Sequence, residues 1–235
     1  MEGLLLVDKP AGWTSFDVVN YVRGVVSRAS VQPGKKVKVG HSGTLDPFAT
    51  GLLILLVGKA YTSQSERLLK QDKSYQAIIE LGRTSTTGDP EGELSPLKEN
   101  LPRPNSERLL KALNTFKGDI LQTPPAFSAI KVSGVRAYKL ARDNRPVELK
   151  PRKVSIKSIE LISYAYPLAE IQTTVSSGTY IRSLVEDIGS ELGLGAYTKN
   201  LRRLTVGSYS IEQASQIEQI TEHTIASLLG KLSLA

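Results

Sequence analysis

The feature that most constrains the fold is a run of six apolar residues, Leu52 to Val57, the longest in the chain. A run of this length, bounded by turn-forming residues, is typical of a buried strand. It is far shorter than the roughly 20 residues that a membrane-spanning helix needs. Directly before it stands a loop of mostly small and polar residues, VGHSGTLDPFATG (39–51). We expect the core behind this loop to hold it rigidly, as in many functional loops.

The rest of the chain mixes pairs of strands with helices. We expect Ser15 to cap a helix whose apolar side carries Phe16 and five valines, and the last 25 residues to be helical. The order does not alternate strictly between strand and helix, so we predict an α+β fold with a mixed, largely antiparallel sheet flanked by helices. The other expected strands cover 3–7, 73–82, 152–163, 168–176 and 197–209, and the other expected helices cover 60–70, 106–113, 135–143 and 180–192.

Length and composition narrow the class of protein. The 235 residues are enough for one extended domain or a domain with a small appendage. The chain has no cysteine, which excludes disulfides, thiolate zinc sites and thiol nucleophiles. Its two histidines, His41 and His223, are far apart, so we expect no metal site. The first residues lack a basic segment and a cleavage site, so we expect a soluble, cytoplasmic protein without membrane contact.

Positive charge is concentrated in one stretch. The whole chain carries a net charge of +7, and residues 131–157 alone carry nine cations against two anions, Asp143 and Glu148. A polyanion is the simplest partner for such a stretch, and nucleic acid is the leading candidate. The alternative is that these cations only solvate a surface helix and strand.

Asp46 is the candidate catalytic residue of the loop 39–51. It is the only acidic residue between Asp17 and Glu66, and an isolated carboxylate in such a loop can act as a nucleophile or a base. An aspartate before a proline is also a common way to begin a turn. No phosphate-binding glycine motif is present, so local chemistry predicts no nucleotide cofactor.

The segment GHSGTLDPFATGLL (40–53) resembles the signature of the TruB family of tRNA pseudouridine synthases. Further blocks resemble the family in the same order, and together they span nearly the whole chain to about residue 208. They are LLLVDKPAGWTS (4–15), KSYQAIIELGRTSTTGDPEGE (73–93), TPPAFSAIKVSGVRAYKLAR (123–142), SSGTYIRSLVEDIG (176–189) and KNLRRLTVG (199–207).

The resemblance implies the pseudouridine synthase fold and an activity without cofactor or metal. The implied reaction converts uridine 55 in the T-loop of tRNA to pseudouridine after the base has flipped out of the stack. Asp46 would be the catalytic residue. Its attack on the sugar C1′, its addition to the base and its removal of a sugar proton all stay open.

The resemblance also implies roles for other residues. Tyr75 would stack on the flipped uracil and help to remove the C5 proton, although its place in an alternating strand also fits a core residue. Arg182 would form an ion pair with Asp46, and His41 would hold the T-loop open. Further substrate-binding candidates are Tyr180, Leu201, Lys9 and Asp89, and the candidates for phosphate contact in the basic stretch are Lys131, Arg136, Arg142, Arg152 and Lys153.

For the domains, we expect a catalytic domain at 1–209 with a basic, RNA-gripping insertion around 123–157. A short helical tail at 210–235 would leave no complete PUA module, so recognition would rest on the T-arm of tRNA. We expect a monomer without a protein partner. The rival functions are a tRNA-binding chaperone without modification activity and a glycosidase, although glycosidases typically need two carboxylates.

Overall fold

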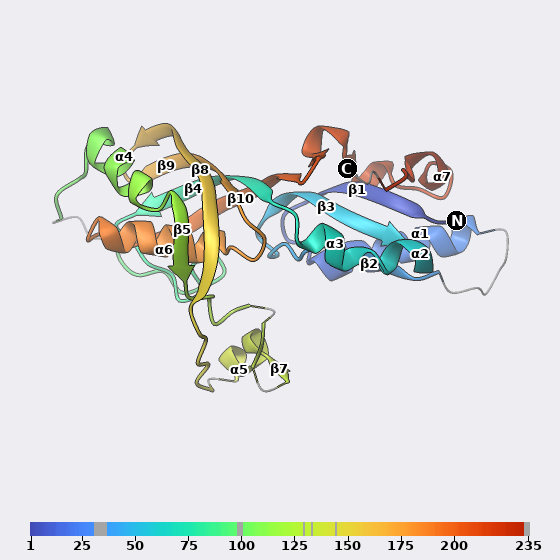
Figure 1. Ribbon diagram of the computed structural model, residues 1–235, viewed down its shortest axis with the longest axis horizontal. Coiled ribbons are helices and arrows are strands. Elements are labelled where there is room, and N and C mark those ends of the chain that lie inside the picture. Colours follow the sequence, from blue (N-terminus) through green and yellow to red (C-terminus); the bar gives the residue numbers. More distant parts are fainter. Residues whose placement is uncertain (31–36, 98–100, 129, 133, 144, 233–235) are drawn as a thin grey trace. The chain divides into compact units, whose positions relative to one another are not determined.

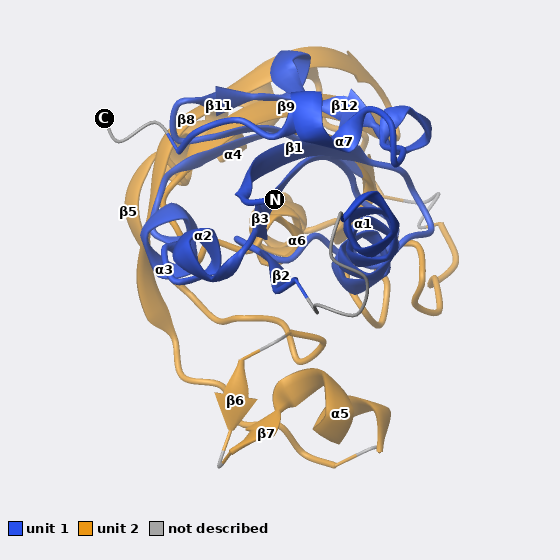
Figure 2. Cartoon of the chain, turned by 90° about the vertical axis from the view of Figure 1, so that its right-hand side faces the viewer, with its two compact units in different colours: residues 1–75, 201–235 blue, residues 76–200 orange. Residues whose placement is uncertain are grey.

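In a computed structural model of the chain, the described residues are 1–30, 37–97, 101–128, 130–132, 134–143 and 145–232 (Figure 1). They form two compact units (Figure 2). Unit 1 comprises residues 1–75 and 201–235, and unit 2 comprises residues 76–200. Strands β4 (Lys73–Leu81) and β10 (Ala196–Val206) each run along the chain from one unit into the other. Residues 210–235, which the sequence sets apart as a tail, belong to unit 1.

Unit 1 is built on the buried apolar run. Strand β3 (Thr50–Val57) pairs antiparallel with β1 (Gly3–Lys9) from Gly3 opposite Val57 to Lys9 opposite Gly51. β2 (Val39–His41) pairs antiparallel with β3, and β10 pairs parallel with it. All residues of β3 from Gly51 to Val57 are buried, as expected for a strand covered on both faces. The loop 42–49 therefore lies between two strands that the core fixes.

Helix α1 (Ser15–Ala29) is capped one residue earlier than the sequence suggests. Thr14 is the N-cap: its hydroxyl accepts a hydrogen bond from the Asp17 N–H, and the Asp17 carboxylate accepts one from the Thr14 N–H. This reciprocal capping box leaves Ser15 buried as the first helical residue. The five valines are buried as predicted, but Phe16 is 59% exposed and lies beneath the Arg23 guanidinium, so its place on the apolar side was wrong.

The predicted helix at 60–70 is two short helices, α2 (Lys59–Thr62) and α3 (Ser65–Leu69). Leu68 of α3 joins a buried cluster with Leu4 of β1 and alternate leucine and isoleucine side chains of β3. Tyr209, in the short strand β11 (Tyr209–Ser210), closes the same cluster. Tyr61 of α2 and Leu68 of α3 thus pack in the cluster that contains the strand following the loop 42–49, whereas Leu69 is 48% exposed.

The C-terminal segment is mostly irregular, and its prediction as helical was wrong. It contains two single-turn 3-10 helices, Ile211–Gln213 and Ile217–Gln219, the strand β12 (Ser215–Gln216) and the four-residue helix α7 (Ile225–Leu228). Each 3-10 helix begins with a capping box. The residue that follows each helix, Ala214 or Ile220, has an extended backbone, so the helix ends after a single turn. β12 pairs parallel with β1, and Gln216 donates a 3.0 Å hydrogen bond to Asp8.

Unit 2 carries strands in the order β4, β9 (Leu168–Val175), β8 (Arg152–Ala165) and β5 (Gly118–Gln122), and β8 pairs antiparallel with both β9 and β5. Helix α4 (Ser106–Thr115) contacts β8 and α6 (Ile181–Glu191). β4, β8, β9, α4 and α6 confirm the expected elements within a few residues, whereas β5 was not expected from the sequence. Most pairs in the two units are antiparallel, and β1–β12 and β3–β10 are parallel, which confirms the mixed α+β fold.

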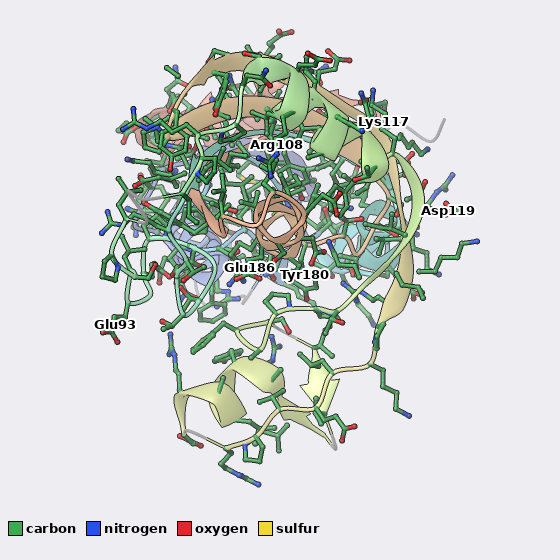
Figure 3. The ribbon with its side chains drawn as sticks, turned by 90° about the vertical axis from the view of Figure 1, so that its left-hand side faces the viewer. Glu93, Arg108, Lys117, Asp119, Tyr180 and Glu186 are labelled. Carbon is green, nitrogen blue, oxygen red and sulfur yellow. The ribbon has the colours of Figure 1, made fainter. Side chains whose placement is uncertain are left out.

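Between β5 and β8 the chain leaves the sheet and returns. This excursion, residues 123–151, contains the hairpin of β6 (Lys131–Val132) and β7 (Val135–Arg136) and the helix α5 (Ala137–Arg142). All three views show the hairpin and α5 projecting from the rest of unit 2 on two connecting segments (Figures 1, 2 and 3). We call residues 123–151 the insertion. Among the helices of the described residues, none is long and apolar enough to cross a membrane.

Candidate active site

Asp46 is half-buried in a loop whose backbone is held from several sides. Leu45, just before it, is fixed by Ser15: the Ser15 hydroxyl accepts from the Leu45 N–H at 2.8 Å and lies 3.0 Å from the Leu45 carbonyl oxygen. Pro47, just after it, accepts from the Gly12 N–H at 2.9 Å. The Asp46 carbonyl oxygen itself accepts from the Ala49 N–H at 3.1 Å, so the residue also begins a turn. An aspartate that begins a turn can therefore also be the candidate catalytic residue.

Lys9 braces the same loop from β1. Its side chain is fully buried, and its ammonium group donates to the carbonyl oxygens of Pro10, Trp13 and Pro47 at 2.8, 2.6 and 3.1 Å. Three carbonyl acceptors match the three donors of an ammonium group. Lys9 thus lies at the base of the Asp46 loop, tied to the residue that follows the aspartate.

Arg203, on β10, fixes the two ends of the loop. It is 1% exposed, and its guanidinium donates to the carbonyl oxygens of Leu52 at 2.7 Å and Gly43 at 3.2 Å. Its backbone also passes close to Gly51, where a Cβ atom would lie 2.3 Å from the Arg203 oxygen. Gly51 has a φ of +103°, which also favours glycine. Strand β10 can approach the start of β3 only because no side chain stands at position 51.

Lys73 is a third buried cation near this loop. Its Nζ donates to the carbonyl oxygens of Leu69 and Gln71 at 2.9 and 2.6 Å, and its Cε lies 3.7 Å from the position of a Cβ on Gly43. Burial, together with the positive charge of Arg203 and against the opposing effect of Asp72, lowers the pKa of Lys73 to about 8. Three cations thus surround the backbone of the loop that carries Asp46.

The lowered pKa of Lys73 predicts how stability changes with pH. The unfolded chain keeps the ordinary value of 10.5, so between about pH 8 and pH 10 it binds more protons than the folded chain. Stability should therefore rise with pH in this window, by about 1–2 kcal/mol from pH ~7.5 to pH ~9.5 relative to a Lys73→Met variant. Denaturant unfolding at the two pH values measures this difference. Lys70→Met, at an exposed lysine, should match the wild type, and parallel curves for wild type and Lys73→Met would refute the prediction.

The other predicted residues of unit 1 lie on strands. His41 ends β2 and is half-buried, Tyr75 on β4 is 7% exposed, and Leu201 on β10 is 5% exposed. Tyr75 alternates with the buried residues Ala77 and Ile79, as the sequence pattern indicates.

In unit 2, Arg182 and Asp89 form a buried ion pair. Their side chains are 3% and 4% exposed, and Nη1 of Arg182 lies 3.2 Å from Oδ2 of Asp89. The same guanidinium donates to the carbonyl oxygens of Thr87 and Phe127 at 2.7 and 2.8 Å. Asp89 accepts from the Thr87 hydroxyl and, at 3.0 Å, from the Glu91 N–H. The loop that holds Asp89 therefore also orients Arg182.

Two further acidic residues follow Arg182 on α6. Burial raises the pKa of Glu186, against the lowering effect of Arg182, and burial also raises the pKa of Asp187. Figure 3 shows Glu186 and Tyr180 on the side of α6 that faces the insertion. Tyr180 is the N-cap of α6 and is half-buried.

The cations of the basic stretch differ in their surroundings. Lys131 and Arg136 are exposed and directly opposite each other on β6 and β7. Arg142 lies 5.6 Å from the ring centre of Tyr138, and Lys153 pairs with Asp119 at 2.9 Å on the exposed face of the β5–β8 ladder. Arg152 lies over the ring of Tyr180. Lys131 and Arg136 are therefore the best placed of these five cations to bind an external anion.

Sequence reasoning missed several residues that shape these sites: Ser15, Lys73, Arg203 and Gln122. Arg203 and Lys73 look like ordinary charged residues of strands, and only their burial reveals their role. Gln122 gives no local signal either, because its partner, Tyr180, is 58 residues away in the sequence. In the described part of the chain, no group of three or more histidine, aspartate and glutamate side chains could hold a metal ion.

Comparison with known proteins identifies relatives over most of the chain. The family model for the N-terminal domain of TruB family pseudouridylate synthases matches residues 31–181, and the model for the tRNA pseudouridylate synthase B C-terminal domain matches residues 182–230. The tRNA pseudouridine synthase B of Aquifex aeolicus is 44% identical over 93% of this chain and 73% of its own. That of Chlamydia abortus is 42% identical over 90% of this chain and 86% of its own.

Solved structures show the same fold. A chain in the crystal structure of a Cbf5-Nop10-Gar1 complex superposes with a TM-score of 0.69 at 27% identity, over 92% of this chain. This chain spans about half, 53%, of that longer one. Because a family model covers more than half of the sequence and curated relatives exceed 40% identity over nearly all of it, the chain belongs to the TruB family of pseudouridylate synthases.

Proposed function

We propose that the chain isomerises a uridine of tRNA to pseudouridine, and that this uridine is position 55 in the T-loop. The observation that carries the proposal is the loop 40–53, which has the family's sequence around Asp46 and is braced by Lys9, Ser15 and Arg203. A catalytic carboxylate must be held in a fixed geometry, and a loop tied at both flanking residues provides this. Curated relatives named tRNA pseudouridine synthase B support the substrate class.

The reaction is an isomerisation and needs no oxidant, reductant or cofactor. The bond between N1 of uracil and C1′ of the ribose breaks, the base turns, and a bond between C5 and C1′ forms. C5 loses its proton to solvent, and N1 takes up a proton. In this proposal Asp46 starts the cleavage of the glycosidic bond, as the nucleophile or base of the reaction.

Arg182 and Tyr75 complete the proposed catalytic set. We propose that Arg182 pairs with Asp46 and keeps it ionised, and that Tyr75 stacks on the uracil and assists removal of the C5 proton. The proposed role of Arg182 is supported by the fixed orientation of its guanidinium, which Asp89 and two carbonyl oxygens hold. Removing the Asp89 carboxylate should disturb Arg182, which makes this role testable.

The substrate must also leave the base stack. Extruding a base costs a few kcal/mol, and the enzyme has to replace the lost stacking. We propose that His41 enters the T-loop for this purpose and that Tyr180 and Leu201 line the pocket for the base. tRNA as substrate puts this proposed activity in the cytoplasm, and the chain would act there as a monomer.

We propose that the basic stretch grips the phosphates of the T-arm. Lys131 and Arg136 support this role, because like charges directly opposite each other on two strands destabilise the hairpin unless an anion lies nearby. Contacts of this kind add affinity and salt dependence without sequence preference.

This role predicts the salt dependence of binding. Lys131→Ala and Arg136→Ala should each weaken tRNA binding and each reduce the slope of log Kd against log salt by about 0.7–0.9. Filter binding between about 50 and 200 mM salt measures the slope. Lys111→Ala, at an exposed lysine of α4, serves as the control and should keep the wild-type slope. Unchanged slopes for both insertion variants would contradict phosphate contact by the hairpin.

Release of tritium from tRNA transcript labelled at uridine C5 tests the proposed function directly. We expect the wild type to release tritium in proportion to the number of target uridines, with the product at position 55. Binding without release would instead identify a tRNA-binding chaperone. Release of free uracil would identify a glycosidase.

A further inference from the structure

Two residues mark the place where the insertion leaves and rejoins the sheet of unit 2. Gln122 is the last residue of β5, Arg152 is the first residue of β8, and the two are directly opposite each other in the β5–β8 ladder. Everything between them belongs to the insertion. Both side chains turn to the same neighbour, Tyr180, at the start of α6.

Gln122 holds the backbone of Tyr180. Its side chain is fully buried, its Oε1 accepts from the Tyr180 N–H at 2.8 Å, and its Nε2 donates to the Tyr180 carbonyl oxygen at 3.0 Å. α6 has no cap from the side chain of its own N-cap residue. The carboxamide of Gln122 thus supplies, from another strand, an acceptor for the N–H at the start of this helix.

Arg152 holds the ring of Tyr180. Its guanidinium carbon lies 4.9 Å from the centre of the ring, and the same group donates to the carbonyl oxygen of Gly178. Gly178, whose φ is +85°, lies beside the guanidinium, and a Cβ there would be in ordinary van der Waals contact with it at 3.6 Å. A guanidinium can present its planar face to the ring while it donates from its edge, whereas an ammonium group has no planar face.

The first residues of the insertion continue the contact along α6. The Ser183 hydroxyl donates to the Thr123 carbonyl oxygen at 3.0 Å, and Nη2 of Arg182 donates to the Phe127 carbonyl oxygen at 2.8 Å. The N-terminal turn of α6, which carries Arg182, is thus bonded to the segment by which the insertion leaves the sheet.

We propose that Gln122 and Arg152 are positioning residues that hold Tyr180 and the first turn of α6 in place for the reaction, from the two attachment points of the insertion. This inference rests on the proposed function, because it assigns these residues an effect on pseudouridine formation. It also separates Arg152 from Lys131 and Arg136: Arg152 acts on the reaction through Tyr180, and the hairpin cations act on tRNA affinity.

Rate and affinity separate these roles. Gln122→Met keeps the length of the side chain but removes both hydrogen bonds, and Arg152→Lys keeps the charge but removes the planar stack. In single-turnover tritium release at saturating tRNA, each variant should be slower by about tenfold to a hundredfold, the range expected for a small misplacement of reacting groups. The tRNA Kd should stay within about threefold of the wild-type value. The slope of log Kd against log salt should equal that of the wild type within error.

A second readout does not depend on activity. Gln122→Met should speed hydrogen exchange of the amides at 180–183, because the Tyr180 N–H loses its acceptor. Thr173→Val is the matched control: Thr173 is equally buried in unit 2 and donates to the Ser158 carbonyl oxygen of the neighbouring strand β8, not to a residue of α6. It should leave both the rate and the exchange at 180–183 unchanged.

Unchanged rate and exchange in Gln122→Met would overturn the positioning role of Gln122. A rate unchanged in Arg152→Lys but a salt slope reduced in Arg152→Ala would make Arg152 a phosphate contact instead. If both act on Tyr180, the double variant should lose less than the product of the two single losses. If the wild type released no tritium, the proposed function would fail, and the exchange measurement would still decide whether the contact orders α6.

Discussion

Asp46→Asn is expected to abolish pseudouridine formation while leaving tRNA binding intact. Asparagine is nearly isosteric with aspartate but is neither a nucleophile nor a base, and the loop backbone is held by Lys9 and Ser15 independently of the Asp46 side chain. The single-turnover rate should fall by at least about three orders of magnitude, as for other enzymes that lose their nucleophile. Tritium release measures the rate, and filter binding measures the affinity.

Glu66→Gln is the matched control for this experiment. It makes the same change from acid to amide in unit 1, but at an exposed residue that forms an ion pair with the exposed Lys70 four residues later. It should release tritium at the wild-type rate. A rate for Asp46→Asn within tenfold of the wild type would remove Asp46 from the proposed catalytic role.

The sequence predicts most elements of the fold because their patterns are local. The apolar run 52–57, the alternation in 73–82 and the valines of α1 each report a buried face that the structure confirms. The C-terminal segment was predicted wrongly as helical: two of its turns begin with a capping box, but the residue after each turn is extended, and one pair of residues adds a strand beside β1. A long-range pairing of two residues leaves no periodic signal in the sequence.

The buried residues that hold the candidate site, such as Arg203, could not be predicted for a different reason. Arg202 and Arg203 are neighbours on β10, yet Arg202 is paired with Asp8 whereas Arg203 is buried against carbonyl oxygens. Alternation along a strand says that the two point to opposite faces, but not which face meets the loop. Phe16 shows the same limit on a helix. The pattern of apolar residues indicates which side of α1 is buried, but Phe16 lies at the edge of that side and is exposed.

The second large effect is expected at Asp89. Asp89→Asn removes the charge that compensates Arg182 in a site where both side chains are at most 4% exposed. Leaving one partner of a buried pair without its counter-charge typically costs about 3–5 kcal/mol of stability. We also expect a lower rate of pseudouridine formation, because Arg182 would lose one of the groups that orient it. Denaturant unfolding and single-turnover tritium release measure the two effects.

Two further variants separate charge from fold in this prediction. Asp119→Asn makes the same change in unit 2 at an exposed ion pair with Lys153, and its unfolding curve and rate should match the wild type. In the double variant Asp89→Asn with Arg182→Met, no buried charge is left uncompensated, so it should be more stable than Asp89→Asn alone. The double variant should nevertheless be inactive, because it lacks the Arg182 guanidinium that the proposed reaction needs, even where its stability is regained. A double variant that regained activity with its stability would show that Arg182 serves the fold and not the reaction.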